Sequence, residues 1–388
     1  MTDSPATTTS TKVLLKDCCE EISQRIDNPA ESGFERFVGL EHLKTGETSI
    51  RNWGSTEDVT SSMKLFKTGD VIVARRNVYL RRAARAYFDG VCSGDGIVLR
   101  PNSDICLPDL LPFLLNTDAF WNYVTSQADG TMSKRITVKR LLAYEFALPP
   151  MEEQRRIAKG LKIATSALEK SQDLSARLAQ LRDALGFSLW NPKWNKKNMM
   201  PLGDVCIKIQ DGTHFSPQST EGEFLYVTSK NIRDGYLDIS TAGHISREEH
   251  EGIYKRCDVQ FGDLLLTKDG ANAGNIAVNT IREEFSLLSS VAFIRVDPEK
   301  LDPTYAFEYL RSCVGQARLL AHVKGSAITR LTLTQIRGFL IPLPDIGTQK
   351  QNALELSEIQ SRLDDLAGRQ AALGRVITSM KQSLDMPV

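Results

Sequence analysis

The sequence predicts an α+β protein with two tandem α+β globular domains. Each domain is followed by a long helix, and the two helices are expected to form an antiparallel coiled coil. Three observations predict this organisation: an internal repeat, a proline-marked helical segment closing each half, and short apolar strands between turns within each half. The 388 residues are enough for two domains of ordinary size.

The boundaries follow these signals along the chain. Residues 1–12 are mostly small and polar and are predicted to be disordered. The predicted order is then a first globular domain over 13–148, a long helix over 149–190, a linker over 191–200, a second globular domain over 201–343 and a second long helix over 344–386. The start has no signal-peptide pattern and no apolar run is long enough to span a membrane, so we expect a soluble, cytoplasmic protein.

The repeat is clearest just before each long helix. GTMSKRITVKRLLAYEFALPPMEEQ, from Gly130, aligns without a gap with GSAITRLTLTQIRGFLIPLPDIGTQ, from Gly325. Identical pairs include Arg135/Arg330, Thr137/Thr332, Pro149/Pro344 and Gln154/Gln349. A duplication of this length predicts that the protein does the same kind of thing twice.

Within each predicted domain, a Gly-Asp turn precedes a strand that is apolar without alternation, at 71–74 and at 264–267. Further strands are expected at 96–100 and 290–296, each followed by a proline turn. A helix is expected next in each domain, at 107–128 and 302–323. Short strands mixed with a few helices indicate an α+β domain.

The two long helices are predicted from prolines and periodicity. Pro149 and Pro150 fit the first turn of a helix, and an apolar seam then runs from Ile157 to Leu185, with Arg182 at a skipped position. The second seam, from Leu356 to Leu384, keeps a heptad pattern, which favours a coiled-coil partner. The alternative is two amphipathic helices on separate cores, which such narrow seams would cover poorly.

Composition limits the possible partners and chemistry. The net charge is zero and the pI is about 7.0, so any nucleic-acid contact requires a local concentration of basic residues. The seven cysteines are scattered without a C-x-x-C pair, which indicates a reducing compartment and no metal framework. There is no Gly-rich phosphate loop of an ATP motor. The segment NPKW, from Asn191, is a poor match to a methyltransferase motif because Lys193 replaces the second proline.

The segments ALPPMEEQRRIA and IPLPDIGTQKQNA resemble the helix-entry motif of the specificity subunits of type I restriction–modification enzymes. Asp345 and Thr348 depart from that motif in the second copy. The runs DGTHFSP (211–217) and RNVYLRR (76–82) are also similar to segments of this family. The resemblance covers nearly the whole chain after residue 12, and the duplicated layout is its most specific feature.

The resemblance implies a function for each part. Each globular domain would be a target-recognition domain that reads one half of a bipartite double-stranded DNA target. The helices would set the spacing and dock two methyltransferase subunits, and restriction subunits would join this core. The chain itself would be non-catalytic and bind no cofactor or metal, with S-adenosylmethionine, ATP and Mg on the partner subunits.

Candidate DNA-binding residues in the first domain are basic or polar side chains suited to phosphates and base edges. They are Arg75, Arg76, Asn77, Tyr79, Arg81, Arg82, Lys134 and Arg135. In the second domain the corresponding loop has fewer charges and more glycine and asparagine; the candidates are Thr213, His214, Lys230, Asn231, Lys268, Asn272, Asn275 and Arg330. The alternatives are a solvated basic surface in the first domain, an ordinary turn at 268–275, and a structural histidine at 214.

Two other functions stay open from the sequence. One is a coiled-coil adaptor whose two domains bind proteins rather than DNA. The other is a specificity subunit of a different methyltransferase-based defence system. Strong salt dependence of DNA binding separates the adaptor from the other two, because phosphate contacts release counterions. A helix of 35 to 40 residues spans roughly 55 Å, so the target is expected to be two short half-sites with an unread gap.

Overall fold

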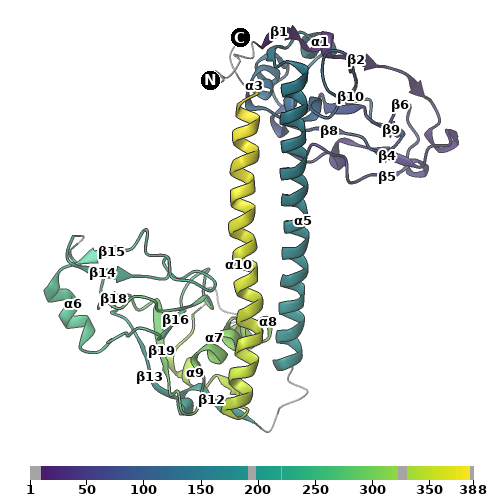
Figure 1. The fold of residues 1–388 in the computed structure, drawn as a ribbon. Helices are drawn as coiled ribbons and strands as arrows, with labels where there is room; N and C mark the ends of the chain where they lie inside the picture. Colours follow the sequence, from purple (N-terminus) through teal and green to yellow (C-terminus); the bar gives the residue numbers. More distant parts are fainter. Residues whose placement is uncertain (1–9, 191–197, 220, 322–329, 385–388) are drawn as a thin grey trace, which may run out of the picture. The chain divides into compact units, whose positions relative to one another are not determined.

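The computed structural model describes residues 10–190, 198–219, 221–321 and 330–384. The chain divides into two compact units, Met1–Gln172 with Gly368–Val388, and Asp173–Ala367. Two long helices, α5 (Met151–Trp190) and α10 (Ile346–Gln382), each contribute to both units (Figure 1). Each unit also contains a globular part that mixes helices and sheets, as predicted for an α+β domain.

The globular part of the first unit is built on two main sheets, with strand orders β2-β10-β7-β8 and β3-β6-β9-β4-β5, and on the pair β1-β11. Its strands are β1 (Thr11–Leu14), β2 (Cys19–Ile22), β3 (Arg25–Ile26), β4 (Arg36–Val38), β5 (Gly54–Ser55), β6 (Met63–Phe66), β7 (Val71–Ala74), β8 (Ala83–Arg85), β9 (Gly90–Cys92), β10 (Gly96–Pro101) and β11 (Glu145–Leu148). Its helices are α1 (Leu15–Cys18), α2 (Leu111–Leu114), α3 (Asp118–Gln127) and α4 (Val138–Leu142), with the short 3-10 turns η1 (Pro29–Glu31), η2 (Leu40–His42), η3 (Thr56–Asp58) and η4 (Val78–Leu80).

The globular part of the second unit has sheets of order β13-β19-β16-β17 and β15-β14-β18, and the pair β12-β20. Its strands are β12 (Met199–Pro201), β13 (Cys206–Asp211), β14 (Phe224–Val227), β15 (Gly243–Ile245), β16 (Leu264–Thr267), β17 (Ile276–Val278), β18 (Ser286–Leu287), β19 (Val291–Val296) and β20 (Leu340–Pro342). Its helices are α6 (Arg247–Tyr254), α7 (Pro303–Arg311), α8 (Cys313–Ala321) and α9 (Leu333–Arg337), with the 3-10 turn η5 (Leu202–Val205).

The repeat seen in the sequence is present in the backbone. The sheet β2-β10-β7-β8 corresponds strand for strand to β13-β19-β16-β17, and both place the fully buried strand (β7 or β16) beside the long strand (β10 or β19). Thr137 caps α4 and Thr332 caps α9, each by accepting a hydrogen bond from a backbone N–H of the first turn. Threonine is therefore repeated because each short helix needs a cap.

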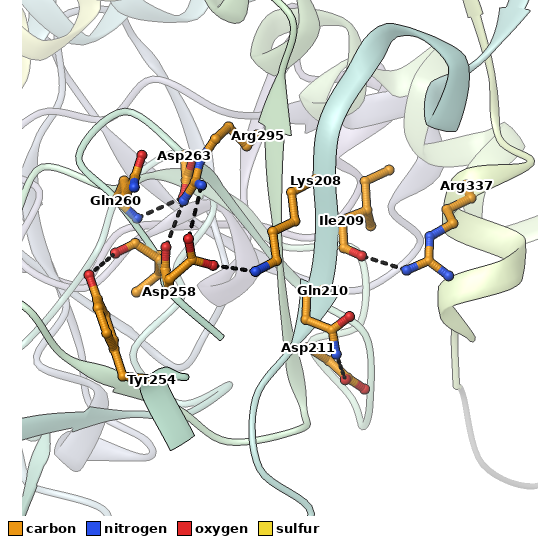
Figure 2. A network of polar contacts seen from close by, with 11 residues as sticks. Lys208, Ile209, Gln210, Asp211, Tyr254, Asp258, Gln260, Asp263, Arg295 and Arg337 are labelled. Carbon is orange, nitrogen blue, oxygen red and sulfur yellow. Dashed lines mark hydrogen bonds and ion pairs between the residues drawn. The ribbon is translucent and has the colours of Figure 1, made fainter. Parts of the chain in front are cut away.

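In both units the aspartate of the repeated Gly-Asp turn makes the same hydrogen bonds, to a backbone N–H of the turn and to an arginine. Gly69 and Gly262 have φ of +100° and +87°, a conformation that favours glycine. The buried carboxylate of Asp70 accepts a hydrogen bond from the Lys67 backbone N–H at 2.8 Å and binds Arg100 through two bonds of 2.9 Å. Figure 2 shows the second copy, in which Asp263 accepts from the Gln260 N–H at 2.7 Å and binds Arg295 at 2.9 and 2.8 Å. These aspartate–arginine pairs attach each turn to the adjacent long strand, β10 or β19.

A buried glutamine attaches each long helix to its globular part. The side chain of Gln154, 2% exposed, accepts from the Leu107 N–H at 2.8 Å and donates to the carbonyls of Ile105 (3.0 Å) and Pro149 (2.9 Å). Gln349, 1% exposed, accepts from the Asp302 N–H at 2.9 Å and donates to the carbonyls of Lys300 (3.1 Å) and Pro344 (2.9 Å). The repeated glutamine is thus a structural residue that orients the helix entry.

Within each unit, α5 and α10 share a hydrophobic core. In the first unit, Ile157 and Leu161 of α5 belong to the core against which Ile377 and Met380 of α10 pack. In the second unit, Trp190 near the end of α5 shares a core with Ala353 and Leu356 near the start of α10. In both units, therefore, the beginning of one helix meets the end of the other.

Arg182 explains the skipped position in the first helical seam. Its guanidinium donates to the carboxylate of Glu308 on α7 at 2.5 Å, and both side chains are largely buried. Arg182 therefore fills its seam position by reaching a buried acid of the globular part of the second unit.

Several predicted boundaries need correction. Residues 11 and 12, predicted to be disordered, belong to β1, where Thr11 and Lys12 pair with β11 and so satisfy backbone hydrogen bonds. Met199 and Met200, assigned to a linker, pair with β20 as part of β12. The long helices begin at Met151 and Ile346, two residues later than predicted, after the proline segments. Residues 1–9, 191–197 and 385–386, for which predictions were also made, lie outside the described residues.

The single helix expected at 107–128 is two helices, α2 and α3, because Thr117 takes an extended conformation and caps α3. The helix expected at 302–323 is likewise divided, into α7 and α8. Ser312 is extended between them, and its hydroxyl accepts from the Gly315 N–H at 2.9 Å. Residues 322 and 323 lie outside the described residues.

Candidate nucleic-acid interface

The candidate residues of the first unit lie on the loop between β7 and β8. The loop is fixed at its start, where the Arg75 N–H donates to the Asp95 carbonyl at 3.0 Å and the Ile136 N–H donates to the Arg75 carbonyl at 2.9 Å. Asn77 and Arg81 flank η4 and are the non-glycine residues with positive φ among those described, at 54° and 48°. Left-handed backbone at non-glycine residues is often found at functional sites.

The structure brings this loop together with residues 133–135, which lie far along the chain. Arg76 donates to the Ser133 hydroxyl at 2.9 Å, and that hydroxyl donates to the Asn77 side-chain oxygen at 2.9 Å. Asp95 lies between the two segments, 3.7 Å from Arg76 and 3.1 Å from Arg135. Arg76, Lys134 and Arg135 are exposed, so the two segments form one polar, basic surface.

Tyr79 and Arg81 lie on the same loop. Tyr79 is 59% exposed at the turn η4. Arg81 is partly exposed and donates to Asp118 on α3 at 2.5 Å. Arg75 is partly buried and contributes chiefly through its backbone.

Arg82 was predicted to contact DNA, and the structure places it in the interior. Its guanidinium donates to the carbonyls of Leu40 at 2.6 Å and Arg76 at 3.4 Å. Burial lowers the pKa of Arg82 from its usual value. Arg82 therefore holds the loop in shape and is not presented to a ligand.

The second unit builds its loop, residues 268–275, by the same backbone contacts. The Lys268 N–H donates to the Ser290 carbonyl at 2.9 Å, and the Leu331 N–H donates to the Lys268 carbonyl at 2.7 Å. Arg330 pairs with Asp269 at 3.3 Å, at the place that Arg135 and Arg76 occupy in the first unit. Asn272 and Arg330 are exposed.

Lys268 and Asn231 were predicted to contact DNA, and both are buried. The Lys268 ammonium lies 3.2 Å from Asp211 and 3.6 Å from Asp269, which satisfy its charge internally. Asn231 accepts from the Thr228 N–H at 2.9 Å and donates to the Asp238 carbonyl at 3.0 Å, as turn-forming asparagines do. Both residues are structural.

The remaining candidates of the second unit differ in exposure. Lys230 is exposed. Asn275 is half-buried and donates to the Ile232 carbonyl at 3.2 Å. The hydroxyl of Thr213 accepts from the Phe215 N–H at 3.2 Å, and His214, about half exposed, lies 3.7 Å from Asp211.

Four residues of these surfaces were not among the sequence candidates. Asp95 and Ser133 organise the first surface, and Phe215 and Arg256 lie beside Thr213 and His214 in the second. Arg256 donates to the Gly212 carbonyl at 2.8 Å, a contact between distant segments for which the sequence carries no signal. Phe215 belongs to the DGTHFSP run, which already drew attention to this loop.

Over the described ranges there is no group of histidine, cysteine, aspartate and glutamate residues that could hold a metal ion. None of the described helices is long and apolar enough to cross a membrane. What the two surfaces offer is exposed arginine, lysine, asparagine and tyrosine on fixed loops, the side chains that contact phosphates and base edges.

Comparisons with known proteins agree with this chemistry. The family model of the type I restriction modification DNA specificity domain matches the chain twice, over residues 12–178 and 195–373. The specificity subunits of the type I restriction enzymes EcoBI and EcoDI of Escherichia coli are 29% identical over 157 residues and 27% identical over 145 residues. These stretches cover 40% and 37% of this chain, and 32% of the length of each relative.

Solved structures show the same fold at low sequence identity. The crystal structure of a type I restriction–modification S subunit from M. genitalium has a TM-score of 0.65 and 14% identity, and covers 100% of this chain and 99% of that one. A structure from a study of complex assembly and conformational transition in a type I R-M system has a TM-score of 0.52 and 19% identity, with 99% of both chains covered. Because the two matches to the family model span most of the sequence, the chain belongs to the type I restriction–modification DNA specificity family.

Proposed function

We propose that this chain reads a bipartite DNA target, one half with each globular part, as the non-catalytic specificity subunit of a type I restriction–modification complex. The observation that carries the proposal is the duplicated loop. In each unit a polar loop follows the buried strand and is held by the same two backbone contacts, with Arg135 or Arg330 beside it. Two copies of one recognition device suit a target with two halves.

The two loops differ in the side chains that they present, which supports different half-sites. The first exposes Arg76 and Tyr79 next to Arg135, and arginine is suited to guanine and phosphate. The second exposes Asn272 on the loop whose Asp269 pairs with Arg330, and asparagine is suited to adenine. The half-sites are therefore expected to differ in sequence.

The long helices are proposed to form an antiparallel coiled coil that sets the gap between half-sites. The two long helices, α5 and α10, have 40 and 37 residues. At 1.5 Å per residue these lengths correspond to roughly 60 and 55 Å. Support comes from the cores of the two units, in each of which the beginning of one helix packs with the end of the other.

The same helices are proposed to dock two methyltransferase subunits, with restriction subunits joining the complex. Ile163 and Leu181 of α5 are 60% and 54% exposed, which leaves apolar side chains for a partner. S-adenosylmethionine, ATP and Mg are expected on those partners, and the chain itself is proposed to bind no cofactor.

Methylome sequencing tests the proposal. The chain is expressed with its neighbouring methyltransferase gene in a host without adenine methylation of its own. The expected result is a split motif methylated on both strands that is absent when this chain is omitted. Co-purification of the two proteins without any such methylation would overturn the proposal and favour a protein-binding adaptor.

A further inference from the structure

The second unit contains a pocket beside its candidate DNA-binding loop. Its volume is about 480 Å³, within the range of small-molecule pockets. The lining includes Thr213, His214, Phe215, Gly252, Ile253 and Arg256. One wall is thus the DGTHFSP run, and the other is a face of α6 with the turn that follows it.

Gly252 keeps the helix wall of this pocket open. A Cβ atom added at Gly252 would meet no other atom within 4 Å. Glycine inside a helix destabilises it relative to alanine, so this residue costs stability without a packing reason in the described structure. Room for a ligand is a physical reason for glycine at this position.

The lining combines flat apolar surface with hydrogen-bonding groups. Phe215 is 82% exposed, and His214 and Arg256 are each about half exposed. The carboxylate of the acidic lining residue Glu249 accepts hydrogen bonds from the hydroxyls of Ser246 and Ser219 and from the Gln218 N–H, which satisfy its charge. An exposed ring next to cationic and polar groups is the combination that binds nucleobases outside a base stack.

The pocket is continuous with the candidate DNA-binding surface of this unit. The Asp211 carboxylate lies 3.2 Å from Lys268, 3.7 Å from His214 and 3.9 Å from Arg256. Asp211 therefore joins the loop 268–275 to both walls of the pocket. Thr213 and His214, two of the candidate DNA-binding residues, themselves line the pocket.

We propose that this pocket receives one nucleobase displaced from the stack of the DNA half-site read by the second unit. Phe215 stacks on the base, and His214 and Arg256 bind its edge or its phosphate. The proposal rests on the proposed function. It adds a base-extruding step to one unit only, because β2 of the first unit leads through residues 23 and 24 into β3, with no counterpart of the DGTHFSP run.

The test uses the assembled complex and duplexes that carry the methylated target. 2-Aminopurine, whose fluorescence rises when it leaves the stack, is placed at or next to each position in turn. Methyltransferase subunits extrude the adenines that they modify, so the informative positions are the remaining ones. We expect a rise at one such position of the half-site read by the second unit and at none in the other half. A wild-type complex that binds the target without a rise at any of these remaining positions overturns the pocket proposal and leaves the proposed function standing. A wild-type complex that does not bind the target overturns both.

Variants separate base binding from other roles. Gly252→Leu fills the pocket, and Phe215→Ala removes the ring; each is expected to abolish the fluorescence rise and weaken specific binding by roughly 10- to 100-fold. Glu251→Leu is the matched control, because Glu251 is the exposed neighbour of Gly252 on α6 and does not line the pocket. It should retain both signals.

Two results would contradict the assignment at the level of variants. A Gly252→Leu complex that binds its target as the wild type does would show that the pocket is empty on DNA. Loss of binding with Arg256→Ala but not with Phe215→Ala would indicate a phosphate contact without an extruded base. Thermal unfolding of each variant shows whether a loss of binding comes from misfolding, and Gly252→Ala, which fits the open space, provides a folded reference.

Discussion

The buried glutamines that attach the long helices give the sharpest test of the fold. Gln154→Met keeps the length of the side chain but removes its polar atoms. The change leaves the Leu107 N–H and the carbonyls of Ile105 and Pro149 without the partner that they have in the wild type. Gln349→Met is the equivalent change in the second unit, where the Asp302 N–H loses its partner.

The magnitude follows from the three hydrogen bonds that each glutamine makes. At about 1 kcal/mol net for each bond, the free energy of unfolding of the affected unit should fall by about 3 kcal/mol. For a unit of this size, such a loss lowers the midpoint of thermal unfolding by roughly 6 to 12 °C. The other unit should keep its stability, because each glutamine contacts only its own unit among the described residues.

Hydrogen exchange measured by mass spectrometry resolves the two units. Gln154→Met should deprotect peptides around Leu107 and leave those around Asp302 unchanged, and Gln349→Met should do the reverse. Gln180→Met, on the exposed surface of α5, is the matched control and should change the free energy by less than about 0.5 kcal/mol. Equal effects of Gln154→Met and Gln180→Met would refute the structural role of the repeated glutamine.

Three further predictions concern the loops, the buried ion pair and the helices. Arg76→Ala should weaken binding to the target and reduce the slope of log affinity against log salt by about 1, measured by fluorescence anisotropy; an unchanged slope would place Arg76 away from phosphate. Burial raises the pKa of the Glu308 carboxyl above its ordinary value despite the neighbouring Arg182. The folded second unit therefore binds the Glu308 proton more tightly than the unfolded chain does. Its free energy of unfolding should fall as pH rises from the ordinary pKa of glutamate to the raised pKa of Glu308. Glu308→Gln should flatten this dependence in urea denaturation, and an unaltered dependence would assign it to other groups. Inserting seven residues into both long helices should lengthen the permitted gap by about 3 base pairs in the methylome, since seven residues add about 10.5 Å and a base pair about 3.4 Å; altered half-sites would contradict the spacer role.

The sequence predicted the features that depend on local periodicity and on repetition. The long helices follow from prolines and an apolar seam, and the two halves follow from the pairs Arg135/Arg330 and Gln154/Gln349. The role of the glutamines was not predicted, because two of the three backbone partners of each lie 47 and 49 residues away along the chain. The sequence shows only that the same glutamine is present in both copies of the repeat, which does not distinguish a structural residue from a functional one.

The exposure of charged residues at the candidate sites could not be predicted from the sequence. Arg82 and Lys268 are buried, whereas Arg76 is exposed. All three follow buried strands in basic or polar loops, so the local sequence does not distinguish the buried residues from the exposed one. Lys268 can be buried because Asp211, from another strand, neutralises its charge. The pocket was also missed, since Gly252 and Arg256 come together with Phe215 only in the folded unit.

Exchange of one globular domain shows whether each unit reads its own half of the target. Residues 1–147 are replaced by the corresponding domain of another family member, and the methylomes of hosts expressing the chimera or the original chain with the same methyltransferase are compared. If each unit reads its own half, one half of the split motif changes while the other half and the gap stay the same. A chimera that changes both halves, or neither, would contradict the claim that each unit reads its own half of the target.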